Sequence, residues 1–322
     1  MLFLKHNGSA LIKFSLVFAV LFVTSCGTNA SPSLQIKGVE EIKLASGGSI
    51  SASDTLWDPT GNRIVVSSYI VPTSKIFLLD LNNGETLLLY ETNGSAGATD
   101  WTPDGRFITA FIDTKDGDGI WNLDPTNEKP PAFITTGHEA SWSPDGAKLA
   151  VWDHSPWIPS GENTEKLCII DIQSKKEDVV FEVKGKDLLA TGLSWSTSGE
   201  YIAFSLSIEH QASQIYLLDV NTNIVSKITD DENDHWSPSW SPDSQLVAYV
   251  SMPSISSESS IMISTIDGKC KVSVPGIANM WAVAWSPDGK QLSFDWRNTK
   301  IYLADLGTIF ERDILTEGID CS

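Results

Sequence analysis

Short runs of alternating apolar and polar residues recur along almost the whole chain, and turn residues bound each run. One unit of the pattern is an apolar run ending in tryptophan, a Pro-Asp-Gly-type turn and a second apolar run, as in SWSPDGAKLAVWD at residues 141–153. Proline presets φ at the second turn position, aspartate bonds nearby backbone, and glycine adopts the left-handed conformation. The unit therefore predicts a β-hairpin.

This hairpin unit occurs six times, and each copy has a tryptophan at the start of its turn phrase. The six are Trp57, Trp101, Trp142, Trp195, Trp240 and Trp285, at spacings of 44, 41, 53, 45 and 45 residues. A third run follows each hairpin, as in KIFLLDL and QIYLLDV, and then a fourth. Four strands per repeat at this period predict an all-β fold, a six-bladed β-propeller of four-stranded antiparallel blades.

One segment before the first blade also resembles an outermost strand. Six blades need six outermost strands, and residues 40–46 and 312–318 both compete for the last place. A segment that leads into the first strand of the first blade must end where the fourth strand of the last blade ends. We therefore predict that residues 38–45 pair with the strand around residues 301–306, so that the N-terminal strand closes the ring.

The phrase WSPDG, followed by an apolar run and then by IYLLD, resembles the repeats of TolB-like (WD40-like) β-propellers, which also occur in the prolyl oligopeptidase family. The resemblance covers roughly residues 36–317. Two turns depart from the pattern, STSG after Trp195 and SPDS after Trp240. The fold implied by this resemblance hosts scaffolds, receptors and enzymes, so function must be argued from individual residues.

The N-terminal residues have a different pattern. Lys5 and Lys13 precede the apolar stretch FSLVFAVLFV at residues 14–23, which is short for a bilayer span and typical of a secretory signal. The stretch ends in VTSC, which resembles a bacterial lipobox. That resemblance implies cleavage before Cys26 and attachment of lipid, including palmitate, to this cysteine. The alternative is an ordinary signal peptide with a coincidental cysteine.

The chain thus divides into three parts: a lipoprotein signal peptide at residues 1–25, a small, polar and flexible tether at 26–35, and the propeller at 36–322. The lipobox resemblance implies a bacterial envelope protein. Gly27 after the cysteine favours the outer membrane if the cell has two membranes; otherwise we expect the outer side of the cell membrane.

The acidic composition narrows the range of partners. The formal net charge of −19 becomes −21 without residues 1–25, which contain two lysines and no acid. Nucleic acid and anionic lipid headgroups require clustered Lys and Arg, so we exclude both as partners. We expect a monomer that contacts the membrane only through the lipid on Cys26 and binds an envelope protein, peptide or glycan.

Strand direction sorts the loops into two faces. In an antiparallel blade, the turns between strands one and two and between strands three and four share one face, the bottom face. The loops between strands two and three and between blades share the other, the top face. All four histidines that follow the signal are predicted in top loops, either as a metal or catalytic site or as solvated residues: His138, His154, His210 and His235.

Aromatic residues are also predicted on the top face. Trp236 and Trp281 stand four residues before a blade tryptophan, as His138 does in the third blade, and either form a ligand platform or pack between blades. Trp157 lies in the only long insertion, residues 153–166, which is either a recognition loop or an exposed elaboration. The candidate ligand-binding residues are His138, Trp157, His210, His235, Trp236 and Trp281.

Common enzyme motifs are mostly absent. The sequence lacks a Gly-x-Ser-x-Gly elbow, a His-Glu-x-x-His pair and a phosphate loop. We therefore expect a non-catalytic, lipid-anchored propeller that binds its partner on the top face without cofactor or metal. The alternative is a metal-dependent, lyase-like enzyme acting on polysaccharide, with a top-face histidine site.

Three cysteines follow the lipobox. The predicted topology puts Cys168 inside a third strand, Cys270 at the bottom start of a fourth strand, and Cys321 after the last blade on the top side. A disulfide needs α-carbons within about 7 Å. We therefore expect three free thiols.

Overall fold

The structure is a computed structural model of the chain. It describes residues 38–42, 54–70, 73–114, 117–154, 162–253, 258–274, 279–296 and 300–306, all within one compact unit, Ser31–Ser322. The signal peptide, the tether with Cys26, and Trp157 lie outside the described residues. In the described ranges, no helix is long and apolar enough to cross a membrane.

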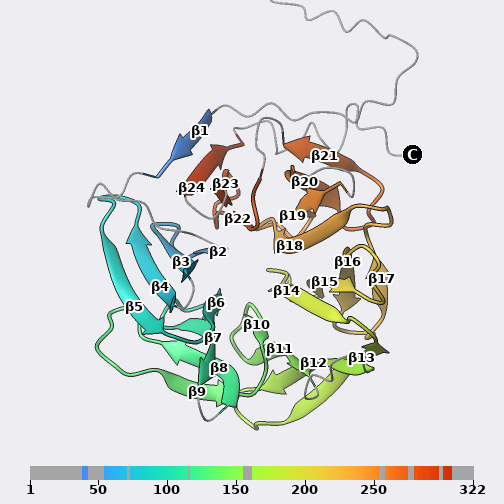
Figure 1. The fold of residues 1–322 in the computed structure, drawn as a ribbon, viewed down its shortest axis with the longest axis horizontal. Coiled ribbons are helices and arrows are strands. Elements are labelled where there is room, and N and C mark those ends of the chain that lie inside the picture. Colours follow the sequence, from blue (N-terminus) through green and yellow to red (C-terminus); the bar gives the residue numbers. More distant parts are fainter. Residues whose placement is uncertain are drawn as a thin grey trace, which may run out of the picture. The chain divides into compact units, whose positions relative to one another are not determined.

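The strands form six four-stranded antiparallel sheets arranged around a centre, so the predicted six-bladed β-propeller is confirmed (Figure 1). The first three blades are β2 (Asp54–Trp57), β3 (Arg63–Ile70), β4 (Thr73–Asp80) and β5 (Thr86–Thr92); β6 (Ala96–Trp101), β7 (Ile108–Thr114), β8 (Gly117–Leu123) and β9 (Ala132–Thr135); and β10 (Glu139–Trp142), β11 (Lys148–His154), β12 (Asn163–Asp171) and β13 (Glu177–Gly185). The last three are β14 (Leu189–Trp195), β15 (Tyr201–Ser207), β16 (Gln214–Asp219) and β17 (Val225–Lys227); β18 (Asp234–Trp240), β19 (Leu246–Met252), β20 (Ser260–Thr265) and β21 (Lys271–Val274); and β22 (Val283–Trp285), β23 (Gln291–Trp296), β24 (Lys300–Asp305) and β1 (Gly38–Glu41).

The Trp-Ser-Pro-Asp-Gly phrase forms the hairpin turn on the bottom face. In blade three, the Gly146 N–H donates to the Ser143 carbonyl at 2.8 Å, and Gly146 has φ of 68°. The Ser143 hydroxyl donates to Asp145 at 2.6 Å and accepts from the Lys148 N–H at 2.9 Å. In the blade-five turn Ser244 takes the glycine position with φ of 58°, so the altered sequence keeps the same turn.

The two ends of the described chain meet in the last blade. β1 pairs antiparallel with β24, from Gly38 opposite Asp305 to Glu41 opposite Tyr302. The Ile42 N–H extends the pairing by donating to the Ile301 carbonyl at 2.9 Å. The inner strands β2, β6, β10, β14, β18 and β22 contact one another in succession, and β22 contacts β2. The predicted closure of the ring by the N-terminal strand is therefore confirmed.

Side chains on the inner strands tie neighbouring blades together. An inner-edge N–H has no partner within its own sheet and needs another acceptor. In three blades, the residue before the blade tryptophan accepts a bond from the backbone N–H of the next blade's tryptophan. These bonds run to Asp100 from Trp142 (2.8 Å), to Ser141 from Trp195 (3.0 Å) and to Ser239 from Trp285 (3.0 Å).

The hydrophobic core lies between blades rather than in one centre. Five of the six blade tryptophans are buried, and Trp57 is half-buried. Ile64, Val247 and Leu292, which follow the hairpin turns, are fully buried. Each sheet thus buries both faces against its neighbours, which explains why the central strands are continuously apolar.

The cysteine prediction is wrong in one part. Cys168 is free and buried, as expected. Cys270, however, is disulfide-bonded, and its partner lies outside the described residues, as Cys321 does. The prediction relied on strand positions alone, and these do not place the cysteines that lie outside the blades.

Candidate ligand-binding site

A cavity of about 490 Å³ lies along the inner strands, from their top ends towards the bottom turns. Its lining comes from all six inner strands, both at their top-side ends, as at Asp54, and close to the bottom turns, as at Asp100, and from the ends of adjacent strands, including Ser207 of β15 and Met252 of β19. Four acidic side chains and several apolar ones line it. They are Asp54, Asp100, Glu139 and Asp234, with Leu189, Trp236, Met252 and Trp281. The lining includes no Lys, Arg or His among the described residues.

Two tryptophans predicted as ligand-binding form one wall of the cavity. The Trp236 and Trp281 ring centroids are 5.7 Å apart, with the ring planes at 33°. The Trp236 indole Nε1 donates to the Trp281 carbonyl at 2.7 Å. The Trp281 side chain remains 52% exposed, which is unusual for so large an apolar group. An exposed ring with fixed surroundings offers contact area to a ligand at little entropic cost.

The loop that carries Trp281 is held by a buried carboxylate. Asp295 of β23 is fully buried, and its Oδ1 accepts the backbone N–H groups of Trp281 at 2.7 Å and Ala282 at 2.8 Å. Hydrogen bonds from two N–H groups to one carboxylate are charge-assisted and therefore strong. The indole is thus presented from a fixed backbone.

Burial raises the pKa values of both Asp54 and Glu139, two of the carboxyl groups of the cavity. Burial, reinforced by the charges of Glu139 and Asp295, raises the pKa of Asp54 to about 8, against the opposing hydrogen bond from the Thr55 N–H. Burial also raises the pKa of Glu139, although His138 and a backbone N–H act in the other direction. A neighbouring cation would lower the pKa values of both groups, because it would stabilise both carboxylates.

Asp100 and Asp234 instead have firm partners. Asp100 accepts the Ser141 hydroxyl at 2.9 Å and backbone N–H groups of its own and the next blade. Burial nevertheless raises the pKa of Asp100 to about 6. Asp234 accepts the backbone N–H of Ser213 at 2.9 Å. These two carboxylates therefore have structural roles and lend negative charge to the cavity.

The register of the inner strands explains which residues reach the cavity. A β-bulge lies between Trp236 and Ser239 in β18, whereas β10 has none, so counting back from the blade tryptophan misaligns the two strands by one residue. In the strand pairing, Trp236, Glu139 and Asp54 occupy equivalent positions. Each is paired with the residue that comes three positions after the partner of its own blade tryptophan. His138 is therefore not the equivalent of Trp236, and the cavity lining contains Glu139 instead.

The described histidine side chains do not meet. His138 pairs with Glu165 at 3.1 Å, His210 with Asp187 at 2.9 Å, and His235 with Asp231 at 2.9 Å. None of the three lines the cavity. The backbone of His154 ends β11, and its side chain lies outside the described residues. Among described residues, no group of three or more His, Cys, Asp or Glu side chains is arranged to hold a metal ion.

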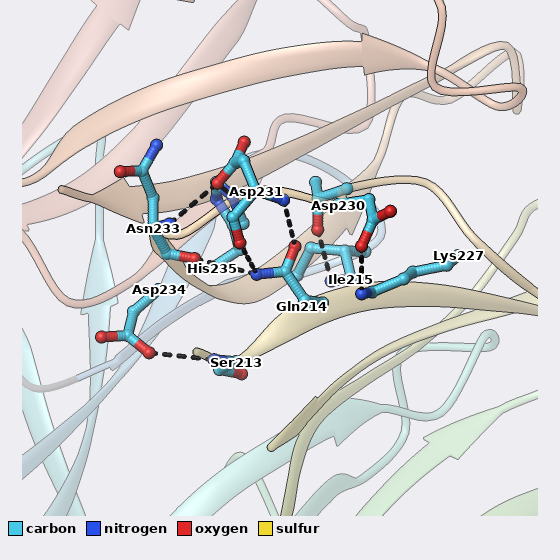
Figure 2. A network of polar contacts seen from close by, with 10 residues as sticks. Ser213, Gln214, Ile215, Lys227, Asp230, Asp231, Asn233, Asp234 and His235 are labelled. Atoms are coloured by element: carbon cyan, nitrogen blue, oxygen red, sulfur yellow. Dashed lines mark hydrogen bonds and ion pairs between the residues drawn. The ribbon is translucent and has the colours of Figure 1, made fainter. Parts of the chain in front are cut away.

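His235 belongs to a polar network that fixes the loop before β18 (Figure 2). Its Nε2 lies 2.9 Å from Asp231 Oδ1, and its ring stands edge-on to Tyr249 at 5.3 Å. Gln214 Nε2 donates to the carbonyls of Asp231 and Asn233 at 2.9 and 3.0 Å. Burial lowers the pKa of His235, although Asp231 opposes this. The histidine therefore supports the backbone that leads to Trp236.

His138 and His210 have contrasting surroundings. Burial acts to lower the pKa of His138, but Glu165, with help from Glu139 and Asp153, raises it overall. The His210 side chain is 82% exposed, and its backbone has a φ of 61° in the loop between β15 and β16. His138 thus adjoins the cavity through Glu139, whereas His210 lies on the open top surface.

No protein-family model matches the chain. The uncharacterised peptidase YuxL of Bacillus subtilis (strain 168) is 26% identical over 213 residues, which cover 62% of this chain and 29% of that protein. The uncharacterised protein Atu1656 of Agrobacterium fabrum is 22% identical over 190 residues, 55% of this chain and 57% of that one. The matched segments therefore span less than two thirds of either relative.

Solved structures share the fold. A protein assigned as TolB in Agrobacterium tumefaciens matches with a TM-score of 0.60 at 18% identity, over 83% of this chain and 96% of that one. TolB from Acinetobacter baumannii matches with a TM-score of 0.56 at 17% identity, over 80% and 64%. An oligogalacturonate lyase in complex with manganese matches with 0.53 at 14% identity, over 87% and 96%. TolB-like propellers are thus structural neighbours, and at these identities the likeness shows the fold alone.

Proposed function

We propose that this protein is a lipid-anchored, non-catalytic propeller of the bacterial envelope that binds a segment of a partner protein or peptide at the top of its ring. One observation carries the proposal: a cavity of about 490 Å³ bordered by the half-exposed indole of Trp281 and the ring of Trp236. Concave sites with aromatic walls and a few placed polar groups are typical of ligand binding. The likeness to TolB structures supports an envelope partner.

The anchor would lie on the side of the protein opposite the tryptophan wall of the cavity. Gly38 stands at the bottom end of β1, opposite Asp305, so the chain reaches the propeller from the bottom face. A lipid on Cys26 and a tether of about ten residues span at most ~35 Å, since each residue contributes up to ~3.5 Å. The bottom turns then tend towards the bilayer, and Trp236 and Trp281 lie on the side away from it. Labelling with radioactive palmitate tests the anchor: it should mark the wild type and not Cys26→Ala.

The binding proposal is tested with the partner recovered from native membranes and identified by mass spectrometry. Trp236→Ala and Trp281→Ala should each weaken its affinity about tenfold or more, as expected for aromatic anchors. We expect the same direction for Trp157→Ala in the long insertion. Variants are compared at matched folded fraction.

Bottom-turn variants are the control for this test. Asp145 and Asp288 each accept a serine hydroxyl and a backbone N–H within their own turn, so Asp145→Ala and Asp288→Ala should lower stability and leave affinity unchanged. If the bottom variants lose as much affinity as the tryptophan variants, the functional face is reversed. If neither set matters, the cavity is not the binding site.

A metal-dependent activity on polysaccharide is the second candidate. The oligogalacturonate lyase neighbour favours it through the shared fold. His138, His210 and His235, however, pair with three different carboxylates, so these three do not form a common ligand set. Release of unsaturated products from oligogalacturonate with added Mn²⁺, measured by absorbance, would establish this alternative and displace the first.

A further inference from the structure

The cavity brings four acidic side chains together, and its described lining contains no cationic side chain. Four carboxylates line it, and none of them forms an ion pair in the described part of the chain. Asp100 and Asp234 are engaged by backbone and hydroxyl donors. Asp54 accepts the N–H of its neighbour Thr55, Glu139 accepts the N–H of Gly192, and no side chain in the described part of the chain donates to either carboxyl group. The unused acceptors of the cavity are therefore those of Asp54 and Glu139.

The apolar part of the same cavity complements a cation. Trp281 exposes its ring beside that of Trp236, and Leu189 and Met252 add apolar surface. Indole faces attract ammonium and guanidinium groups and pack against the alkyl chains that carry them. Since carboxylates and indoles border one cavity, a ligand with a charged end and an apolar body matches both.

We propose that the cavity binds an organic cation, an ammonium or guanidinium group on an alkyl chain, which pairs with Asp54 and Glu139 and contacts Trp281. This inference rests on the proposed function, in which the cavity is the binding site, and names the chemistry of the ligand. A lysine or arginine side chain of a partner segment and a free alkyl amine share this chemistry. A small metal ion does not fit as well, because no three carboxylates of the described residues converge.

The proposal is tested by calorimetric titration of the full chain in detergent. The probes are the capped peptide acetyl-Gly-Leu-Lys-Leu-Gly-amide, its norleucine counterpart without the charge, and 1,5-diaminopentane. The lysine peptide should bind at least about tenfold more tightly than the norleucine peptide. Equal or stronger binding of the diamine would identify a free amine as the source, and weaker binding would identify a peptide side chain.

Isosteric variants assign the effect to the two carboxylates. Asp54→Asn and Glu139→Gln should each reduce the preference for lysine over norleucine by about fivefold or more, because each removes one charged partner. Glu232→Gln is the matched control: it makes the same charge change at an exposed top-side position outside the cavity lining and should leave the preference intact. Circular dichroism verifies that all three variants are folded.

The pH dependence gives an independent readout. Glu139 and Asp295 face Asp54, and His138 adjoins Glu139, so the carboxyl groups of the cavity release protons as the cation enters. Affinity for the lysine peptide should therefore rise from pH 6 to pH 9, with proton release to the buffer. A norleucine peptide that binds as well as the lysine peptide, or a preference that survives both variants, would overturn the inference.

The two proposals fail in different ways. If the native partner depends on Trp281 but the lysine preference is absent, the ligand chemistry is wrong and the binding site stands. If partner binding is indifferent to both Trp236→Ala and Trp281→Ala, the proposed function itself fails. Displacement of the lysine peptide by micromolar CaCl₂ would assign the carboxylates to a metal ion and overturn the inference.

Discussion

Asp54→Asn should stabilise the protein at high pH. The substitution keeps the size of the side chain and an oxygen that accepts the Thr55 N–H, which is 3.0 Å from Oδ1 in the wild type. It removes the negative charge that burial, Glu139 and Asp295 disfavour. The variant therefore isolates the free energy required to ionise one carboxyl group at the top of the ring.

The sign follows from proton binding. The pKa of Asp54 is about 8 in the folded protein and 3.8 for the ordinary group, so between these values the folded state holds more protons than the unfolded state. Stability of the wild type then falls as pH rises from about 4 to about 8, by at most ~1.4 kcal/mol per pH unit. Cavity water screens the charge, so we expect a total difference of about 2 kcal/mol.

Urea unfolding at pH 4, 6, 8 and 9 measures this difference. The free energies of unfolding of variant and wild type should agree near pH 4, diverge steadily to pH 8 and stay parallel above it. Glu232→Gln should follow the wild-type profile. Parallel profiles for Asp54→Asn and the wild type throughout would refute the reasoning, because they would mean that Asp54 is not destabilised when ionised.

Four further substitutions test the frame of the propeller. Ser141→Ala removes the acceptor of the Trp195 N–H between blades and should lower the free energy of unfolding by about 1–3 kcal/mol, measured in urea. Gly137→Ala should cost about 2 kcal/mol or more, since φ is 128° and a Cβ would collide with β11, whereas Gly97→Ala has room and should cost under about 1 kcal/mol in the same assay. Cys270→Ser should lower stability by about 2–4 kcal/mol, and reducing agent should lower the thermal midpoint of the wild type but not of this variant.

The architecture could be predicted because each repeat contains the residues that define its own strands and turns. The tryptophan and its turn mark every hairpin, and strand direction alone led to the pairing of β1 with β24. The disulfide of Cys270 could not be predicted in the same way, because it depends on a chain path that no repeat constrains. Local sequence patterns were therefore sufficient to predict the blades, but they did not predict the segments outside the repeats.

The cavity was only half predictable. Trp236 and Trp281 were identified from their position before the blade tryptophans, but Asp54 and Glu139 were not. The sequence does contain a pattern that could have identified these two acids: each stands three residues before the tryptophan of its blade. It could not be aligned with Trp236, because the bulge around Ser237, whose φ is 55°, shifts the register of β18 and leaves no clear mark in the sequence.

Closure of the ring by β1 also sets an order of events during synthesis. Lys300 Nζ meets Glu41 at 2.8 Å across 259 residues of sequence, whereas each of the first five blades is built from consecutive strands. β1 is made first but can pair only after β24 has been made, and such long-range contacts form slowly. A chain that is still being synthesised therefore cannot complete its ring, so the topology itself delays final folding until β24 has been made.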